Sequence, residues 1–319
     1  MSHTPLGMKG TIAWLLVFFV GIASSTRADD YALVVGVNEC PQFRFANGLQ
    51  PKPLRGAEAD ADDISQLFVN QYNWPSEHVQ VLKGTAATRS AVATAFNELS
   101  KKLRSDDTFV FHFSGHGTQI SDRKPFDEPD GLDEALCPSD ATAMGDNLIV
   151  DDELGLWLEN LPCRQVTVIL DCCHSGTGIK DVDDDVAPRF LTMQLVKQKP
   201  QLETQPKSPW RDLHGDAKSF DRQITAFYAC HAEQQAYERR LPDMKAPARV
   251  GQFSHYFVEG LRDMKADADH NGVVNNSEAF EYAKRRLDET FNRGRQQAVE
   301  RQEPMLESDA GNAPIFRKR

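Results

Sequence analysis

Two apolar runs constrain the possible folds of this chain most, because each ends in small residues and a reactive side chain. The first is Phe111 to Gly117 (FHFSGHG) and the second is Val168 to Gly176 (VILDCCHSG). Compact apolar runs of this kind are typical of strands that are covered on both faces of a parallel sheet. The carboxyl ends of such strands meet at one edge, so the sequence predicts that His116 and Cys173 lie together there.

A histidine that accepts a proton and a cysteine that attacks a carbonyl carbon form a nucleophilic pair. Cysteine attacks as a thiolate, and we expect Cys173 at a strand-to-helix turn, where the helix dipole favours negative charge. We expect the N–H groups of Gly117 and Cys173 to form an oxyanion hole. His112 and His174 are expected to be structural. A zinc site at Cys172, Cys173 and His174 would need a second half, which the sequence lacks.

The remaining pattern alternates between apolar runs and helical stripes, and it predicts an α/β fold with a mainly parallel sheet and helices on both faces. Strands are expected at 31–37, 79–82, 108–114, 166–170 and 224–229, with a possible edge strand at 313–316. Helices are expected at 54–69, 88–103, 151–161, 253–264 and 277–291, and an acidic loop at 122–140. Residues 180–222 break the alternation and are predicted to be a long mobile linker.

The N-terminus has the layout of a secretory signal peptide. Lys9 precedes an apolar stretch at 12–23, and small residues follow, with possible cleavage after Ala23 or Ala28. We therefore expect residues 1–28 to be removed and 29–319 to be an exported domain, periplasmic or secreted. The alternative is that residues 11–23 are retained as a membrane anchor, and only then is a membrane an expected partner.

The formal net charge of −11 argues against nucleic acid as a partner, because phosphate binding needs clustered Lys and Arg. It is compatible with calcium and with basic substrates. The six cysteines lack the dense spacing of a disulfide scaffold. In an exported protein, one disulfide could still form among four of them, namely Cys40, Cys137, Cys163 and Cys230.

Residues 267–278 fit the twelve-position loop of an EF-hand, with Gly272 at the turn and helical patterns on both sides. The expected calcium ligands are Asp267, Asp269, Asn271, the Val273 carbonyl, Asn275 and Glu278. The alternative is an Asp-rich turn without metal.

The segments 112–117 (HFSGHG) and 171–176 (DCCHSG) together resemble the paired signatures of metacaspases and bacterial caspase-like proteases. Segments 54–61 and 130–138 are similar to further parts of the family. His116 and Cys173 are 57 residues apart, close to the separation of about 50 in caspases. The resemblance implies a caspase-like three-layer sandwich with a six-stranded sheet, in which Cys173 is the nucleophile and His116 the base of a cysteine endopeptidase.

The resemblance also implies an acidic pocket for the residue before the cut bond. Asp60 and Asp171 match positions that contribute to it, Ser114 lies beside them, and Glu238 stands about where many members have aspartate. Such a pocket favours peptide or protein substrates with Arg or Lys before the cut bond. The family can also bind calcium through an acidic cluster, for which Asp151 and Asp152 are the best matches.

Two other functions remain open at this stage: a catalytically silent calcium-binding module of the same fold, and an aspartate-directed caspase. For an Arg/Lys-directed protease, the linker offers several self-cleavage points, and the alternative is an uncut surface loop. These points are Arg189, Lys197, Lys199, Lys207, Arg211 and Lys218.

Overall fold

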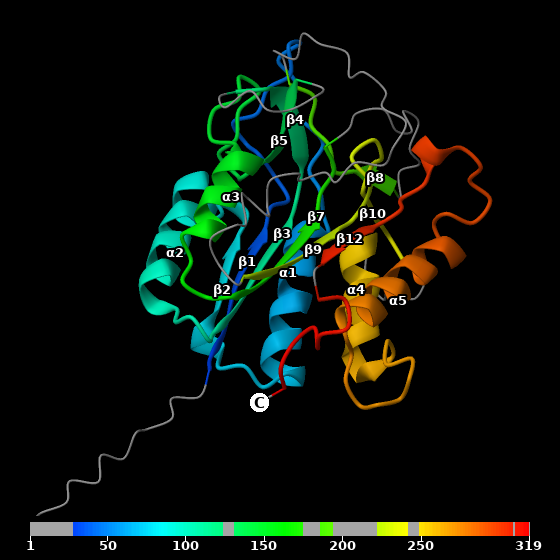
Figure 1. Ribbon diagram of the computed structural model, residues 1–319. Coiled ribbons are helices and arrows are strands. Elements are labelled where there is room, and N and C mark those ends of the chain that lie inside the picture. The colour runs from blue at the N-terminus through cyan, green and yellow to red at the C-terminus, as the bar shows by residue number, and fades with distance from the viewer. Residues whose placement is uncertain are drawn as a thin grey trace, which may run out of the picture.

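A computed structural model describes residues 28–123, 131–174, 186–193, 222–241, 249–308 and 310–318. At its centre is a six-stranded sheet with the order β12-β9-β7-β3-β1-β2 (Figure 1). These strands are β1 Asp30–Gly36, β2 Val79–Lys83, β3 Thr108–Ser114, β7 Gln165–Asp171, β9 Gln223–Tyr228 and β12 Met305–Ser308.

The middle strands are buried because their side chains are apolar on both faces: every residue of β1 and β3 is buried, and so is all of β7 after Gln165. Five of the strands run parallel, and β12 pairs antiparallel with β9. The register places Ser114, the last residue of β3, opposite both Gly36 and Asp171. Three strand ends therefore meet at one edge of the sheet.

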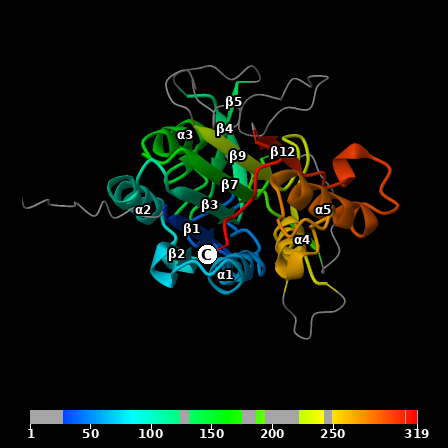
Figure 2. The same ribbon diagram turned by 60° about the horizontal axis from the view of Figure 1, so that its bottom comes forward.

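Helices cover both faces of the sheet (Figures 1 and 2). The helices α1 Ala57–Gln66, α4 Gln252–Leu261 and α5 Asn276–Glu289 contribute to one core layer, and α2 Arg89–Lys102 and α3 Asp151–Glu159 to the other. As the sequence predicted, α2 begins after Thr88, whose side chain accepts a hydrogen bond from the Ala91 N–H at 3.1 Å. The expected α/β fold with a mainly parallel six-stranded sheet is confirmed.

Two small antiparallel sheets lie beyond the main sheet. One contains β4 Gly117–Ser121, β5 Leu132–Leu136 and β6 Ile149–Val150, and the other contains β8 Val186–Pro188, β10 Tyr237–Arg239 and β11 Val250–Gly251. The prediction of a plain acidic loop at 122–140 was wrong, because β5 lies within it. All five residues of β5 are buried, so the pairing with β4 outweighs its two acids.

The C-terminal edge strand was also misplaced. It is β12, at 305–308, rather than 313–316, where Pro314 forms only an isolated bridge with Asn275. Proline has no N–H group to donate to a ladder. The expected signal peptide, together with the anchor alternative at 11–23, lies outside the described residues, as does most of the linker.

Within the described part of the chain, no helix is both long and apolar enough to cross a bilayer. All six cysteines are described, and each is a buried free thiol, so the disulfide considered above is absent.

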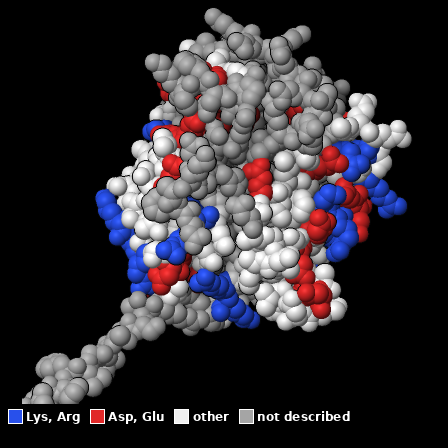
Figure 3. Space-filling model, in the orientation of Figure 1, with Lys and Arg blue, Asp and Glu red and all other residues white. Residues whose placement is uncertain are grey.

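Acidic and basic side chains intermingle on the face shown in Figure 3, most visibly around α5. There, Lys284 pairs with Asp288 and Arg286 pairs with Glu259, both at 3.2 Å. Partly exposed surface pairs of this kind contribute only about 0–1 kcal/mol each. The fold therefore depends on its two apolar layers rather than on these ion pairs.

Candidate active site

His116 and Cys173 each lie two residues beyond the end of a central strand, β3 and β7 respectively. These two strands are paired neighbours, and their extensions stay together: the Gly115 N–H donates to the Asp171 carbonyl oxygen at 3.3 Å. A Cβ on Gly117 would overlap the carbonyl oxygen of Cys173, so a glycine is required at this close approach. The structure thus brings the two predicted catalytic positions to one edge of the sheet, with both side chains buried.

A third segment, residues 186–191, passes through this same place. The Arg189 carbonyl oxygen accepts hydrogen bonds from the Gly117 N–H at 2.9 Å and the Cys173 N–H at 3.4 Å. These are the two N–H groups that the sequence predicted as an oxyanion hole. The arrangement presents the carbonyl of a peptide bond to donors placed to stabilise negative charge on its oxygen.

The side chain of Arg189 fills an acidic pocket. Its Nη2 lies 2.6 Å from Asp60 Oδ2, and its Nη1 lies 2.7 Å from Ser114 Oγ and 3.1 Å from Asp171 Oδ1. Arg189 and Asp171 are fully buried, as is Ser114, and Asp60 is 1% exposed. Three of the four predicted substrate-binding residues therefore surround one guanidinium group.

The pocket also contains groups that the sequence did not single out. The Gly251 N–H donates to Asp60 Oδ1 at 2.9 Å, and the Ser254 N–H donates to Asp171 Oδ2 at 2.9 Å. Both come from the start of α4, where free N–H groups favour carboxylates. In the sequence, the only local indication of these two donors is a glycine before an apolar helical stripe. That pattern does not identify the carboxylates that the start of the helix will contact.

Glu238, the fourth predicted pocket residue, is held differently. Its carboxylate accepts hydrogen bonds from the Arg55 and Gly56 N–H groups at 2.8–3.0 Å and lies 3.6 Å from Arg249. Its charge helps to raise the pKa of Arg189, but its direct partners stabilise the start of α1. Because α1 carries Asp60 in its first turn, Glu238 helps to position Asp60 and does not itself bind the guanidinium of Arg189.

Burial governs the ionisation of the predicted catalytic pair, His116 and Cys173. It raises the pKa of Cys173 to about 12 and, together with the charge of Arg189, lowers the pKa of His116 to about 3. With residues 186–191 in place, both shifts favour a neutral thiol and a neutral imidazole. The residues that follow His174, where the expected helix would begin, lie outside the described residues.

The neighbouring histidines fit structural roles. His112 is buried within β3, and His174 has Nδ1 3.4 Å from the Thr118 carbonyl oxygen and Nε2 3.5 Å from Cys172 Sγ. Burial lowers the pKa of His112 to about 3 and that of His174 to about 4. Both imidazoles are therefore neutral near pH 7.

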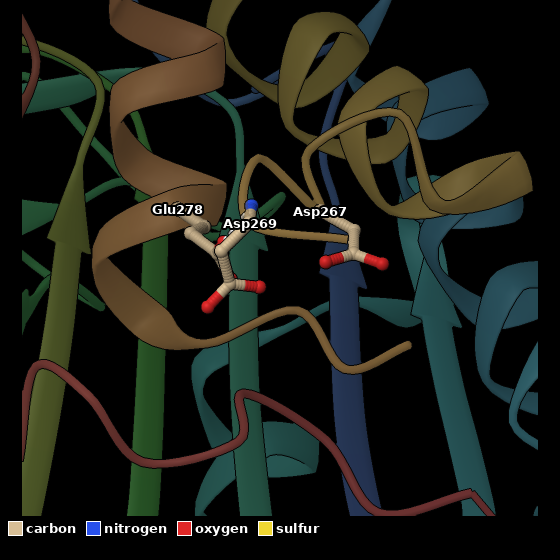
Figure 4. Close-up of side chains that lie close together, drawn as sticks. All are labelled: Asp267, Asp269 and Glu278. Atoms are coloured by element: carbon tan, nitrogen blue, oxygen red, sulfur yellow. Dashed lines mark hydrogen bonds between the residues drawn. The ribbon is translucent and has the colours of Figure 1, made fainter. Parts of the chain in front are cut away.

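A separate acidic cluster lies in the loop 267–278. Oxygens of Asp267, Asp269 and Glu278 lie within 4.8 Å of one another, and Figure 4 shows these three side chains around the loop. Oxygen donors of this kind suit Ca²⁺. The carboxylates already accept loop N–H groups; Asp267, for example, bonds to the Gly272 N–H at 2.9 Å.

Of the other predicted ligands, Asn271 Oδ1 accepts the Val273 N–H at 2.8 Å, and Asn275 Oδ1 accepts the Glu278 N–H at 2.9 Å. The structure thus gathers the three carboxylates among the six predicted calcium ligands. Asn275 also caps α5, where it forms a capping box with Glu278.

A second set of acids lies near β5 and α3. Burial, with the charges of Asp122 and Asp152 nearby, raises the pKa of Asp133 to about 7. Asp151 is buried beside Asp152 in the first turn of α3. Sequence reasoning named Asp151 and Asp152 but missed Asp133, although it lies within the acidic segment 130–138 used for the family resemblance.

Comparisons with known proteins agree with this geometry. Residues 31–182 match the family described as metacaspase, peptidase C14 domain. The chain is 28% identical over 270 residues to Metacaspase-1 of Pyricularia oryzae, covering 79% of this chain and 62% of that protein. It is 35% identical over 184 residues to Metacaspase-1 of Schizosaccharomyces pombe, covering 55% of this chain and 39% of that protein. The chain thus spans less than two thirds of the length of these relatives.

Among solved structures, protein GSU0716 of Geobacter sulfurreducens superposes with a TM-score of 0.57 at 22% identity. The match covers 91% of this chain and 97% of the other. At this identity, the likeness shows a shared fold alone.

Proposed function

Because residues 31–182 match the metacaspase family of peptidase C14 domains, we propose that this chain is a cysteine endopeptidase that cuts after Arg or Lys. Cys173 is the nucleophile and His116 the base. One observation carries the proposal: the buried acidic pocket holds an arginine whose carbonyl oxygen meets the N–H groups of Gly117 and Cys173. An arginine before the cut bond of a substrate would use the same contacts.

In the proposed reaction, the Cys173 thiol gives its proton to His116 as Sγ attacks the carbonyl carbon of the substrate. The Gly117 and Cys173 N–H groups stabilise the oxyanion that forms. His116 then protonates the departing amine, and water hydrolyses the thioester. The raised pKa of Cys173 is consistent with transfer of its proton to His116 during the attack. It does not favour a thiolate and an imidazolium that exist before the substrate binds.

The pocket chemistry supports preference for a cation. Asp60 and Asp171 approach different nitrogens of one guanidinium, a charge-assisted arrangement that suits the planar fork of arginine. Lysine offers a single nitrogen, so we expect it to be accepted less well. An aspartate-directed caspase is disfavoured, because an aspartate side chain would meet two buried acids.

The proposal is tested with fluorogenic peptides that differ only in the residue before the reporter: Arg, Lys, Gln or Asp. We expect turnover in the order Arg, Lys, then Gln, with none for Asp. Cys173→Ala should abolish it, while Cys230→Ala, which removes another buried thiol near the site, serves as the matched control. If the intact protein cleaved none of the peptides with or without calcium, the silent binding module would be favoured. Preference for Asp would overturn the pocket argument.

Calcium is proposed as a ligand of the loop 267–278, supported by the convergence of Asp267, Asp269 and Glu278. Asp151 and Asp152, in the first turn of α3, are a second candidate, with Asp133 nearby. Among the described residues, only Asp267, Asp269 and Glu278 converge closely enough to share one ion. Bound calcium would supply positive charge that compensates these carboxylates. The first site lies in a surface loop and the second beside β5, which pairs with the β4 strand that begins at Gly117. Only the second is therefore connected directly to the catalytic edge.

Export is proposed from the N-terminal pattern alone: Lys9, the apolar stretch at 12–23 and the small residues that follow. Mass measurement of the protein recovered outside the cytosol tests it. A start at Ser24 or Asp29 is expected, and a full-length, membrane-bound chain would favour the anchor alternative.

A further inference from the structure

We propose that a cavity at the amino ends of β3, β7 and β9 is a second binding site, and that its ligand is a small neutral molecule with one flat ring and a primary amide group. The cavity lies far from the active site, because His116 follows the other end of β3, whose seven residues begin at Thr108. A strand of that length spans about 20 Å. In Figure 1, the C-terminal segment that covers the cavity lies at the opposite end of the sheet from β4.

The floor of the cavity is polar. Five side chains from three neighbouring strands line it: Thr108, Gln165, Thr167, Gln223 and Thr225. Side chains alternate between the two faces of a strand, so these five share the face that further along carries Val110, Ile169 and Phe227. Those three are buried in the apolar layer of α4 and α5. Polar groups in such a position need hydrogen-bond partners, which favours water or a polar ligand in the space above them.

The rest of the lining comes from the start of α5 and from the C-terminal segment. Ile315 and Phe316 supply buried apolar surface, whereas Pro314 and Arg317 are exposed, so the cavity opens to solvent beside them. Its volume is about 140 Å³. An apolar cavity of about 150 Å³ holds one benzene molecule. The size therefore favours a single ring, and the mixed lining favours a ring with one polar group.

One polar atom of the lining lacks a partner. Asn276, the first residue of α5, is 4% exposed, and its Nδ2 donates to the Ala310 carbonyl oxygen at 3.0 Å. A carbonyl oxygen can only accept, so this contact fixes the orientation of the amide. Asn276 Oδ1 is then buried without a hydrogen bond to any described residue. An unpaired buried acceptor is costly, and an N–H group of a ligand would satisfy it.

The other polar groups favour an amide over a carboxylate. Gln165 Oε1 already accepts hydrogen bonds from Thr108 Oγ1 at 3.2 Å and from Arg317 Nη2 at 2.5 Å. The guanidinium at the mouth is thus engaged, while the hydroxyl of Thr167 can donate from the floor. A primary amide carries N–H donors for Asn276 Oδ1 and a carbonyl acceptor for such a hydroxyl. A carboxylate has no proton to donate.

The first experiment measures binding to the full-length Cys173→Ala protein, so the result does not depend on catalysis. The probes are benzamide, benzoate and toluene, which share one ring, and binding is followed by ligand-observed NMR and calorimetry. We expect benzamide to bind with a Kd of about 1 mM, a normal value for a ligand of this size. Benzoate and toluene should bind at least tenfold more weakly.

Each other outcome of this series overturns the inference. Preference for benzoate would make Arg317 the anchor, and preference for toluene would make the apolar lining sufficient. If no probe binds, the cavity holds only water.

The second experiment locates the bound benzamide. Asn276→Leu removes the unpaired acceptor, and Thr167→Leu narrows the cavity while leaving that acceptor in place. Each should weaken benzamide binding at least tenfold. Asn160→Leu is the matched control in the opposite layer, because Asn160 Nδ2 also donates to a main-chain carbonyl oxygen, that of Leu156 at 2.9 Å. It should bind benzamide as the parent protein does.

Thermal melting shows which of these variants are folded, and Thr167→Leu decides the question if Asn276→Leu is not. Unchanged binding by a folded cavity variant would place the ligand elsewhere and reject the site.

The third experiment separates this cavity from the acidic pocket. Benzamide at about ten times its Kd should leave the KM of the wild-type protein for the Arg-ended peptide unchanged, because the two sites lie at opposite ends of the sheet. A raised KM would place benzamide in the acidic pocket and overturn the inference. If the wild type has no peptidase activity, the proposed function fails, but the binding measurements still test the cavity.

Discussion

The pocket around Arg189 and the loop 267–278 both gather acids, but they compensate the charge in opposite ways. The pocket is buried, and its cation comes from a segment 129 residues along the chain from Asp60. The loop is partly exposed, and N–H groups of its own residues bind its carboxylates. Because the pocket carboxylates are buried, their charge requires a guanidinium group as a partner. The loop carboxylates are partly solvated, so they need no cationic side chain.

This difference predicts that changes in the pocket affect catalysis strongly, while changes in the loop affect only metal binding.

The largest effect is expected from Gly251→Ala. A Cβ here would overlap Asp171 Oδ2 and lie 2.6 Å from Arg189 Nη1, so the pocket could no longer hold a guanidinium. We expect Arg-ended peptide turnover to fall roughly 1,000-fold, because overpacking costs about 1–3 kcal/mol and the lost ion pair adds to it. The measurement is kcat/KM, with thermal melting as the check on folding. Retention of most of the activity would show that arginine binds elsewhere.

A smaller effect is expected when one pocket acid is neutralised. Asp60→Asn removes the charge that faces Arg189 Nη2 at 2.6 Å. A hydrogen bond to a charged group contributes about 1.5–3 kcal/mol, so kcat/KM for the Arg-ended peptide should fall roughly 10- to 150-fold. Asp267→Asn is the matched control in the other cluster and should leave calcium-free turnover unchanged. Similar losses in the two variants would remove the distinction between the clusters.

Calcium binding should show the reverse pattern. Asp267→Asn or Glu278→Gln should weaken calcium binding at the loop at least tenfold, since each removes one of three converging charges. Isothermal titration with the Cys173→Ala protein measures this without self-cleavage. Any calcium response that survives in the loop variants is expected to disappear with Asp152→Asn. Unchanged binding in all of these variants would leave calcium without a site among these acids.

The smallest effect concerns stability against pH. Burial lowers the pKa of His112 to about 3, so the folded state excludes a proton that the unfolded chain takes up below about pH 6.5. The stability contributed by the neutral imidazole is therefore present in full above about pH 6.5 and is lost progressively as the pH falls from there to about 3.

Between pH 7.5 and 5.5, this one group should remove about 1.4 kcal/mol from the free energy of unfolding. Urea unfolding of Cys173→Ala, compared with the same protein carrying His112→Leu, measures the difference. An equal pH dependence in the two proteins would contradict the assignment.

Much of the fold was accessible from the sequence, because the central strands are continuous apolar runs and the helices have clear stripes and caps. The misses share one cause: β5 and β12 depend on pairing with β4 and β9, and the segments LDEAL and MLES alone do not reveal that pairing. Similarly, the spacing of the oxygen-bearing residues predicted the loop 267–278, but only the structure shows that Asn275 caps α5.

The sequence by itself determined that a histidine and a cysteine lie together, because residues that follow two neighbouring apolar strands share the edge at which those strands end. The tertiary structure decided what fills that edge. Spacing along the chain does not show that Arg189, rather than another basic residue of the linker, neutralises Asp60 and Asp171. Burial of charge requires a partner, and only the folded chain determines which one is within reach.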